Sequence, residues 1–342
     1  MNTLQSSYTP IFLQNKKRAM ILVALFLLCA GAFVLALSVG AAKISLHDAL
    51  NALINGQHED TALKILLHIR LPRAIGAIAA GSALAVSGVI IQAVINNPMA
   101  APNLIGVNAG AGFFTIAVMA VFPMMTAYLP AAAFVGALLT ALLIFAISSK
   151  TGAGKITVTL IGIAVGSILT AGINTVKTLF PDSIYDVSGF LIGGLSGATN
   201  QTVLPALIPI LPSLAAATVL SRSLDALSLG ENVASGLGIN VKRTRILWLT
   251  VAALLSGAAV SFSGLIGFVG LLIPHIMRKA VGGNHRFLIP ASMLGGGAFL
   301  LLADTLSRTL FTPYELPVGI LMSLIGGPFF IILVLNQRRA TK

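Results

Sequence analysis

Long apolar runs, separated only by short polar segments, dominate the sequence. Hydrophobic residues make up 57% of the 342-residue chain and charged residues only 9%, against roughly 25% in an ordinary soluble domain. Too few polar side chains remain to cover a globular surface in water, so the sequence predicts an integral membrane protein. The runs are continuously apolar rather than alternating, which indicates membrane-spanning helices and not a barrel of strands.

The apolar runs predict an all-α protein with about ten transmembrane helices. A helix needs about 20 apolar residues to cross the hydrocarbon core of a bilayer, and ten such spans fit within residues 1–342, which we treat as a single transmembrane domain. An even number of spans places both termini on the same side of the membrane. The predicted spans are 19–40, 71–95, 104–122, 127–148, 156–180, 201–221, 246–263, 265–281, 287–310 and 317–335.

The distribution of basic residues predicts the orientation. The net charge is +12, but the lysines and arginines occur in small groups between apolar runs rather than on one compact face, which argues against a nucleic-acid partner. With both termini in the cytoplasm, most basic residues fall on the cytoplasmic side, as the positive-inside rule requires. The exceptions on the outer side are Lys43, Lys64, Arg70, Arg73, Lys177 and Arg308.

A motif in residues 81–98 recurs in residues 257–274. The matched residues of the first copy are Gly81, Ala83, Ser87, Gly88, Ile90 and Pro98, which recur as Gly257, Ala259, Ser263, Gly264, Ile266 and Pro274. Because the second predicted span runs inward and the seventh outward, the two copies are inverted. Inverted repeats with proline-broken helices are typical of transporters, and the alternative is a chance match between two helices rich in small residues.

The residues that usually carry catalysis or ion coupling do not form a recognisable pattern. The five histidines form no i, i+4 pair, and the single Cys29 gives no thiolate metal site. Asp304 is the deepest acid and Glu315 precedes the last span. The sequence therefore places no carboxylate at the membrane midplane, where proton-coupled or sodium-coupled transporters usually carry one. The sequence predicts a transporter that is not an enzyme and has no cofactor; an ion-driven secondary transporter and an intramembrane enzyme are the alternatives.

The hydrophilic segment between the sixth and seventh spans, residues 222–245, is the most informative polar stretch. Its leucines, valines and alanines predict a short amphipathic helix on the cytoplasmic side, bounded by glycines. One interpretation is a helix that lies on the lipid surface. The other is a docking element that receives force from a soluble partner, and composition does not separate the two.

Three of the basic residues on the outer side are arginines close to span ends. Arg70 and Arg73 flank Leu71 and Pro72 at the start of the second span, and Arg308 lies at the end of the ninth. Such arginines either extend toward lipid headgroups or bind carboxylates of a partner through paired hydrogen bonds.

Together these motifs resemble a known family of transport proteins, the permease subunits of binding-protein-dependent ABC importers for iron–siderophores, haem and vitamin B12. Each motif is weak alone, but in combination they are specific and cover nearly the whole chain. The matching stretches are 70–73, 81–88, Gln92, 97–102, 104–107, 229–231, 237–238, 267–271, Pro274, His275, Arg278, 302–304, Arg308, 315–319 and 326–330. Met99 and Gly327 depart mildly from the family pattern, in which leucine and alanine are commoner.

The resemblance implies the type II ABC importer permease fold and a place in the cytoplasmic membrane of a bacterium. It further implies a second permease subunit, identical or homologous, two cytoplasmic ATPase subunits that bind ATP and Mg²⁺, and an extracytoplasmic substrate-binding protein. The implied function is import of an iron–siderophore complex or a related metal chelate, driven by ATP hydrolysis in the partner subunits. Import of haem or vitamin B12 by the same mechanism is the alternative.

The resemblance also implies roles for individual residues. Arg70, Arg73 and Arg308 would meet acidic residues on the binding protein, an implication that favours docking over contact with headgroups. Residues 223–242 would contact the ATPase, through Leu224, Leu227, Leu229, Gly230, Glu231, Ala234, Leu237 and Gly238. The translocation path would be lined by the fifth and tenth spans, around Gly162, Gly166, Thr170, Pro317 and Gly319.

Overall fold

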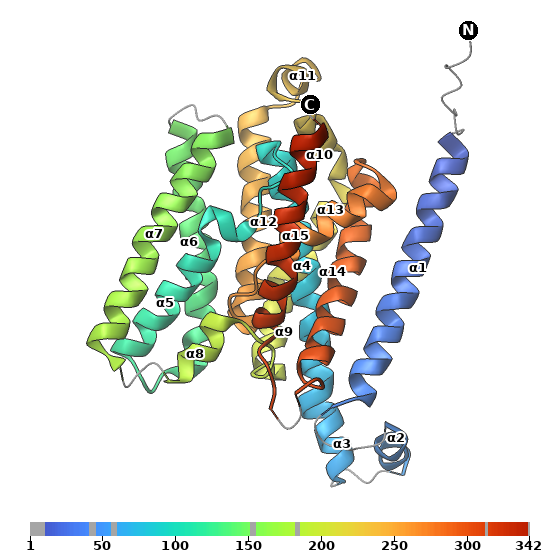
Figure 1. Cartoon of the computed structure of the whole chain (residues 1–342), viewed down its shortest axis with the longest axis vertical. Helices are drawn as coiled ribbons and strands as arrows, with labels where there is room; N and C mark the ends of the chain where they lie inside the picture. Colours follow the sequence, from blue (N-terminus) through green and yellow to red (C-terminus); the bar gives the residue numbers. More distant parts are fainter. Residues whose placement is uncertain are drawn as a thin grey trace.

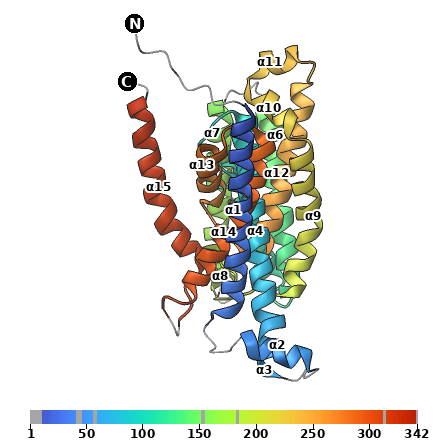
Figure 2. The same ribbon diagram turned by 90° about the vertical axis from the view of Figure 1, so that its right-hand side faces the viewer.

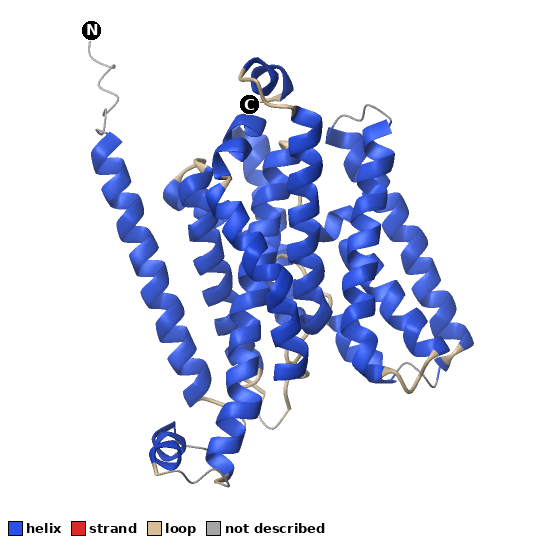
Figure 3. Ribbon diagram, turned by 180° about the vertical axis from the view of Figure 1, so that it is seen from behind, coloured by secondary structure: helices blue, strands red, loops and turns tan. Residues whose placement is uncertain are grey.

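The chain folds into a bundle of helices. The computed structural model describes residues 11–40, 46–55, 60–150, 155–181, 185–311 and 314–340, and within these ranges it contains no strand (Figure 3). This all-helical architecture follows from the apolar runs, because a backbone in lipid can satisfy its hydrogen bonds only within helices or a closed barrel.

The bundle contains helices of very different lengths. The long ones are α1 (Ile11–Ser38), α4 (Leu71–Ile95), α6 (Leu129–Lys150), α7 (Lys155–Leu179), α9 (Asn200–Val219), α12 (Val241–Ser263), α14 (His285–Ser307) and α15 (Val318–Ala340). The shorter ones are α2 (Leu46–Ile54), α3 (Thr61–Ile65), α5 (Val107–Val121), α8 (Tyr185–Ile192), α10 (Ser221–Ser228), α11 (Glu231–Gly236) and α13 (Val269–Val281). Single turns of π- or 3₁₀-helix occur at η1 (Leu66–Arg70), η2 (Pro102–Ile105) and η3 (Thr126–Tyr128).

The bundle has two distinct ends. Helices α2 and α3 lie at one end, and α10 and α11 lie at the other (Figure 1). We call these the α2–α3 end and the α10–α11 end. Helix α1 starts and α15 finishes at the α10–α11 end, so the two termini of the helical bundle lie on the same side (Figures 1 and 2). This placement agrees with an even number of crossings.

The predicted spans coincide with helices, with one exception. Among the described residues, seven helices are long and apolar enough to cross a membrane, and two shorter apolar helices, 107–121 and 318–333, correspond to the third and tenth predicted spans. The eighth predicted span, 265–281, is wrong as a continuous helix: α13 has 13 residues, about 20 Å of helix. Residues 264–268 before it are not helical. The total of ten crossings therefore remains a prediction.

Helix α4 forms the centre of the bundle. All but three of its residues are buried, and it packs against α9, α12, α13 and α14. Its contact with α14 is very close, because Gly81 faces Gly296 so tightly that a Cβ atom on either residue would overlap the other's carbonyl oxygen. Small residues allow such backbone contact between membrane helices.

The two copies of the repeated motif lie in antiparallel helices. Helix α4 begins at the α2–α3 end and α12 begins at the α10–α11 end (Figure 1). Helix α4 packs on α14, the second α-helix after α12, and α12 packs on α6, the second α-helix after α4. Gly81 contacts α14, and its counterpart Gly257 contacts α6 at Phe134 and Ala137. The inverted repeat predicted from the sequence thus corresponds to equivalent packing positions.

The glycine contact between α4 and α14 predicts a large cost for any added side chain. Gly81→Ala should lower the unfolding temperature in detergent strongly, because overpacking costs about 1–3 kcal/mol and here the obstacle is backbone that cannot rotate away. Gly31→Ala in α1 is the matched control, since no atom lies within 4 Å of the place that its added Cβ would take. Equal unfolding temperatures for the two variants would contradict the contact.

Candidate functional site

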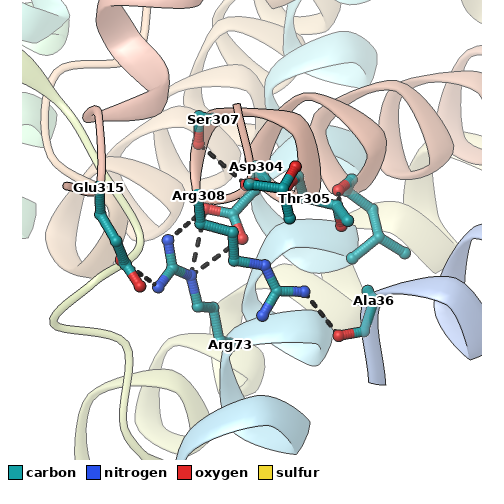
Figure 4. A network of polar contacts seen from close by, with 9 residues as sticks. Ala36, Arg73, Asp304, Thr305, Ser307, Arg308 and Glu315 are labelled. Carbon is teal, nitrogen blue, oxygen red and sulfur yellow. Dashed lines mark hydrogen bonds and ion pairs between the residues drawn. The ribbon is translucent and has the colours of Figure 1, made fainter. Parts of the chain in front are cut away.

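A buried ion-pair network lies at the α2–α3 end. Arg73, in the first turn of α4, faces Asp304 near the end of α14: Nε is 2.9 Å from Oδ2, and Nη2 is 3.0 Å from Oδ1. Its remaining nitrogen, Nη1, donates to Oε2 of Glu315 at 2.8 Å (Figure 4). Asp304 is only 1% exposed, whereas the side chain of Glu315 is 35% exposed. One guanidinium group therefore joins α4, the end of α14 and the segment before α15.

Two more arginines donate hydrogen bonds to the C-terminal end of α1. Arg308 donates from Nη2 to the carbonyl of Ala36, and Arg70 donates from Nη1 to the carbonyl of Leu37 at 2.6 Å. The last carbonyls of a helix have no partner within the helix and carry its negative dipole end, so cations there are favourable. The two arginines thus fasten α1 to the ends of α4 and α14.

Local sequence explains why the arginines converge. Asp60 caps α3 by accepting hydrogen bonds from the amides of Ala62 and Leu63, and the π-turn η1 connects α3 to α4 without a break. Pro72 occupies the first turn of α4, where a missing N–H costs nothing. Arg70 and Arg73, three residues apart, therefore lie on neighbouring positions of one helical surface.

The predicted docking residues are thus at one end of the molecule, but their side chains are bound to this chain. Arg70, Arg73 and Arg308 are between 5% and 7% exposed, and each donates hydrogen bonds to groups of its own chain. Neither extended contact with headgroups nor a free docking surface describes this arrangement. A docking role remains a prediction that requires these bonds to be shared or exchanged.

The predicted ATPase-coupling segment forms a short helical hairpin at the α10–α11 end. Leu224, Leu227 and Ala234 are buried against the bundle, whereas Leu229 and Leu237 are 63% and 62% exposed. Val233, between them, is also exposed, at 49%. Leu229 lies just before α11, Val233 within it and Leu237 at its end. We call Leu229, Val233 and Leu237 the apolar ridge.

The hairpin is held to the bundle by polar contacts. The indole nitrogen of Trp248 in α12 donates to the hydroxyl of Ser223 at 2.9 Å. Oδ1 of Asp225 lies 2.6 Å from Nδ1 of His285 and accepts from the backbone amide of the same residue at 2.9 Å. Glu231 and Arg245 form an exposed ion pair at 2.6 Å. The segment is therefore attached to both α12 and α14.

Comparison with known proteins identifies the family. Residues 25–336 match the model of the FecCD transport family. The chain belongs to the FecCD transport family. It is 39% identical over 310 residues to a hemin transport system permease protein of Yersinia pestis, a match that covers 88% of this chain and 92% of the relative. It is 36% identical over 327 residues to the ferric enterobactin transport system permease protein of Escherichia coli K12, covering 94% and 97%.

This FecCD chain has the same fold as a transporter of known structure. A transporter described as of the metal-chelate ABC type, in an inward-facing conformation, matches with a TM-score of 0.82 and 30% identity, covering 93% of this chain and 99% of that one. The type II ABC importer permease fold expected from the sequence is thereby confirmed. The chain is a multi-pass membrane protein of a permease family.

The predicted path residues of this FecCD chain divide into packing and exposed positions. Gly162 and Gly166 face the region of η2 and α5, and the amide of Gly319 donates to the carbonyl of Gly193 at 3.0 Å. Pro317 lies beside Gly194. Thr170 is exposed, and its hydroxyl bonds back to the carbonyl of Gly166. Packing accounts for the glycines, and a path-lining role for any of the five residues stays a prediction.

Sequence reasoning does not identify the partners that complete these sites. It marks Asp304 and Glu315 as acids near span ends and as parts of the motifs that resemble the family, but it does not pair either acid with Arg73, and it does not single out Asp225 and His285. One signal is local: Asn284 caps α14 by accepting from the amide of Arg286, which marks a helix start with a histidine at its first position. Nothing local pairs that histidine with a residue 60 positions earlier.

The buried ion pair predicts a clear asymmetry between single and double variants. Asp304→Leu leaves the Arg73 guanidinium buried without its main partner and should lower the free energy of unfolding by about 3–5 kcal/mol. Arg73→Leu combined with Asp304→Leu should recover most of that loss, because a buried ion pair replaced by apolar side chains is often neutral. Denaturant unfolding in detergent measures the free energy of unfolding of the single and the double variant.

Arg243→Ala, at an exposed arginine, is the control for that series. A double variant as unstable as the sum of the two single variants would contradict a direct pair between Arg73 and Asp304.

Proposed function

We propose that this chain is the permease subunit of an ABC importer that moves an iron–siderophore complex, or a related metal chelate, across the cytoplasmic membrane. Two permease subunits would enclose the path, two cytoplasmic ATPases would supply the energy, and an extracytoplasmic binding protein would deliver the substrate. The α10–α11 end would face the cytoplasm and the α2–α3 end the outside. Family membership supports the class, and the relatives' names support the substrate class.

The observation that carries the proposal is the apolar ridge. Leu229, Val233 and Leu237 are exposed apolar side chains, whereas the other exposed side chains of residues 222–245 are polar or charged. Leu224 and Leu227 hold that segment firmly to the bundle. An exposed apolar row on a rigid support is the pattern of a protein-docking helix that fits a groove. Leu224 and Leu227 attach the segment to the bundle, and the exposed Leu229 and Leu237 that follow remain available to a partner, which favours this use over a helix lying passively on lipid.

The substrate class is proposed from the relatives and from the chemistry of the chain. Among the described residues, no three His, Cys, Asp or Glu side chains gather where they could hold a metal ion. This supports passage of the metal inside its chelate, with tight recognition by the binding protein. Relatives are named for hemin and ferric enterobactin, and another for cobalamin, so haem and vitamin B12 are the alternative substrates.

The arginines of the α2–α3 end support docking of an acidic partner. Arg73 binds both carboxylates, Asp304 and Glu315, and Arg308 lies close enough to both acids to interact with them electrostatically. Glu315 is the more exposed of the two acids and binds a single nitrogen of Arg73. A carboxylate of the binding protein would take the place of Glu315 on that nitrogen.

The function is tested with the purified complex. Reconstituted with its ATPase and binding protein, the complex should hydrolyse ATP faster when the loaded binding protein is present and should accumulate ferric siderophore in vesicles. Uptake that continues without the ATPase subunits would contradict the proposal and favour a secondary transporter.

Polar substitution of the apolar ridge should uncouple the chain from the ATPase. Leu229→Ser with Leu237→Ser should weaken co-purification of the ATPase subunit by about tenfold or more, since burying a leucine is worth about 1.5–3 kcal/mol. Met124→Ser is the matched control, because Met124 is 96% exposed at the opposite end. Unchanged co-purification of the ridge variant would show that the ridge is not the docking surface.

If a carboxylate of the binding protein replaces Glu315 on Arg73, removal of the Glu315 charge should strengthen association with the binding protein. Glu315→Gln should tighten association with the binding protein by up to about fivefold, because a partly exposed ion pair is worth about 0.2–1 kcal/mol. Titration of the labelled binding protein onto the reconstituted complex measures the change, with Glu231→Gln at the other end as control. Weaker or equal association would count against exchange at Arg73.

A further inference from the structure

We infer that Asp225 and His285 form a joint between α14 and the predicted ATPase-coupling segment, the hairpin of α10 and α11, which we call the coupling hairpin. The joint positions this hairpin on α14, so that movement of the hairpin is passed to that helix. This inference rests on the proposed function, in which the hairpin receives force from an ATPase. The two residues are positioning residues: they contact neither substrate nor ATPase. They lie where a short cytoplasmic helix meets the first turn of a membrane-spanning helix.

The geometry of the joint is well defined. A single carboxylate oxygen, Oδ1 of Asp225, is 2.9 Å from the backbone nitrogen of His285 and 2.6 Å from its Nδ1. Two bonds to one residue, one from the main chain and one from the side chain, fix both the distance and the direction between α10 and α14. The imidazole is 3% exposed, so water does not compete for Nδ1.

Electrostatics favour a charged carboxylate at this position. Asn284 accepts from the amide of Arg286, and Asp225 accepts from the amide of His285, so the first turn of α14 is capped partly by another helix. A negative charge at a helix N-terminus is stabilised by the helix dipole. Burial alone would raise the pKa of Asp225, but the hydrogen bonds from His285 outweigh it and hold the pKa below its ordinary value.

Capping alone does not explain the histidine. Within the described part of the chain, no group bonds to Nε2 of His285, although that atom is buried. An unsatisfied buried polar atom is destabilising, and a residue with only a backbone amide would avoid this cost while keeping the cap. The imidazole is explained by its second bond, which makes the contact directional.

The joint lies at one end of a continuous connection through the molecule. Helix α14 runs from His285 to the α2–α3 end, where Asp304 binds Arg73 of α4 (Figure 4). Helix α10 also packs on α4 through buried apolar side chains, and Ser223 binds Trp248 of α12. The Asp225–His285 contact is the charged and directional member of this set, and it leads to the arginine network at the opposite end.

Variants of His285 test the joint without relying on a large deletion. In His285→Asn the amide nitrogen can lie close to the position of Nδ1 and donate to Asp225, whereas in His285→Gln it lies nearer the position of Nε2. We expect the Asn variant to retain stimulation of ATPase activity by the binding protein within about twofold. The Gln variant should lose about fivefold to tenfold of it, the effect of one or two net hydrogen bonds.

Variants of Asp225 test the same contact from the side of the acceptor. Asp225→Asn keeps an acceptor oxygen and should behave like His285→Asn, while Asp225→Ala should behave like His285→Gln. The Asp225→Ala, His285→Gln double variant should be no worse than either single variant, because both remove one contact. Co-purification of ATPase and binding protein is measured for every variant, so that lost stimulation is compared only among assembled complexes.

The readout is the ratio of ATPase rates with and without the binding protein, and uptake per ATP hydrolysed. Equal ratios for His285→Asn and His285→Gln would overturn the joint, as would additive losses in the double variant. A wild-type complex that shows no stimulation would instead overturn the proposed function, and the inference with it. Gly31→Ala in α1 serves as the neutral control, because no atom lies within 4 Å of the place that its added Cβ would take.

Discussion

The backbone contact between α4 and α14 at Gly81 and Gly296 determines much of the rest of the structure. The helices are antiparallel, so equal steps away from the contact, backward in α4 and forward in α14, reach the same level. Arg73 and Asp304 each lie eight residues from their glycine, which is about 12 Å of helix. The glycine contact therefore sets both the distance between the helices and the register that brings the ion pair together.

That register gives a structural role to the three arginines that the sequence analysis predicts on the outer side, against the positive-inside rule. A guanidinium group near a membrane surface needs partners, and here Arg73 has two carboxylates while Arg70 and Arg308 have the last carbonyls of α1. Their first effect is to hold three helices together at one end. Any docking function is built on the same bonds, which makes the more exposed Glu315 the natural point of exchange.

The sequence predicted those features that depend on composition, and it failed where a feature depends on contacts between distant residues. Apolar runs located α4 and α12 because lipid forces such runs into helices. The run 265–281 was also predicted as a span, yet Phe268 adopts a left-handed conformation there and α13 starts only after it. In the coupling segment the leucines were grouped together, and only the fold separates buried Leu224 from exposed Leu229.

The hairpin of α10 and α11 is attached to the most tightly packed part of the bundle. Helices α12 and α14 both pack closely on α4, and a densely packed unit transmits displacement instead of absorbing it. Helix α15, in contrast, makes few contacts along its length and is held at its start by the Gly319–Gly193 bond. In the proposed function, a push on α10 would therefore act on α4, α12 and α14 together.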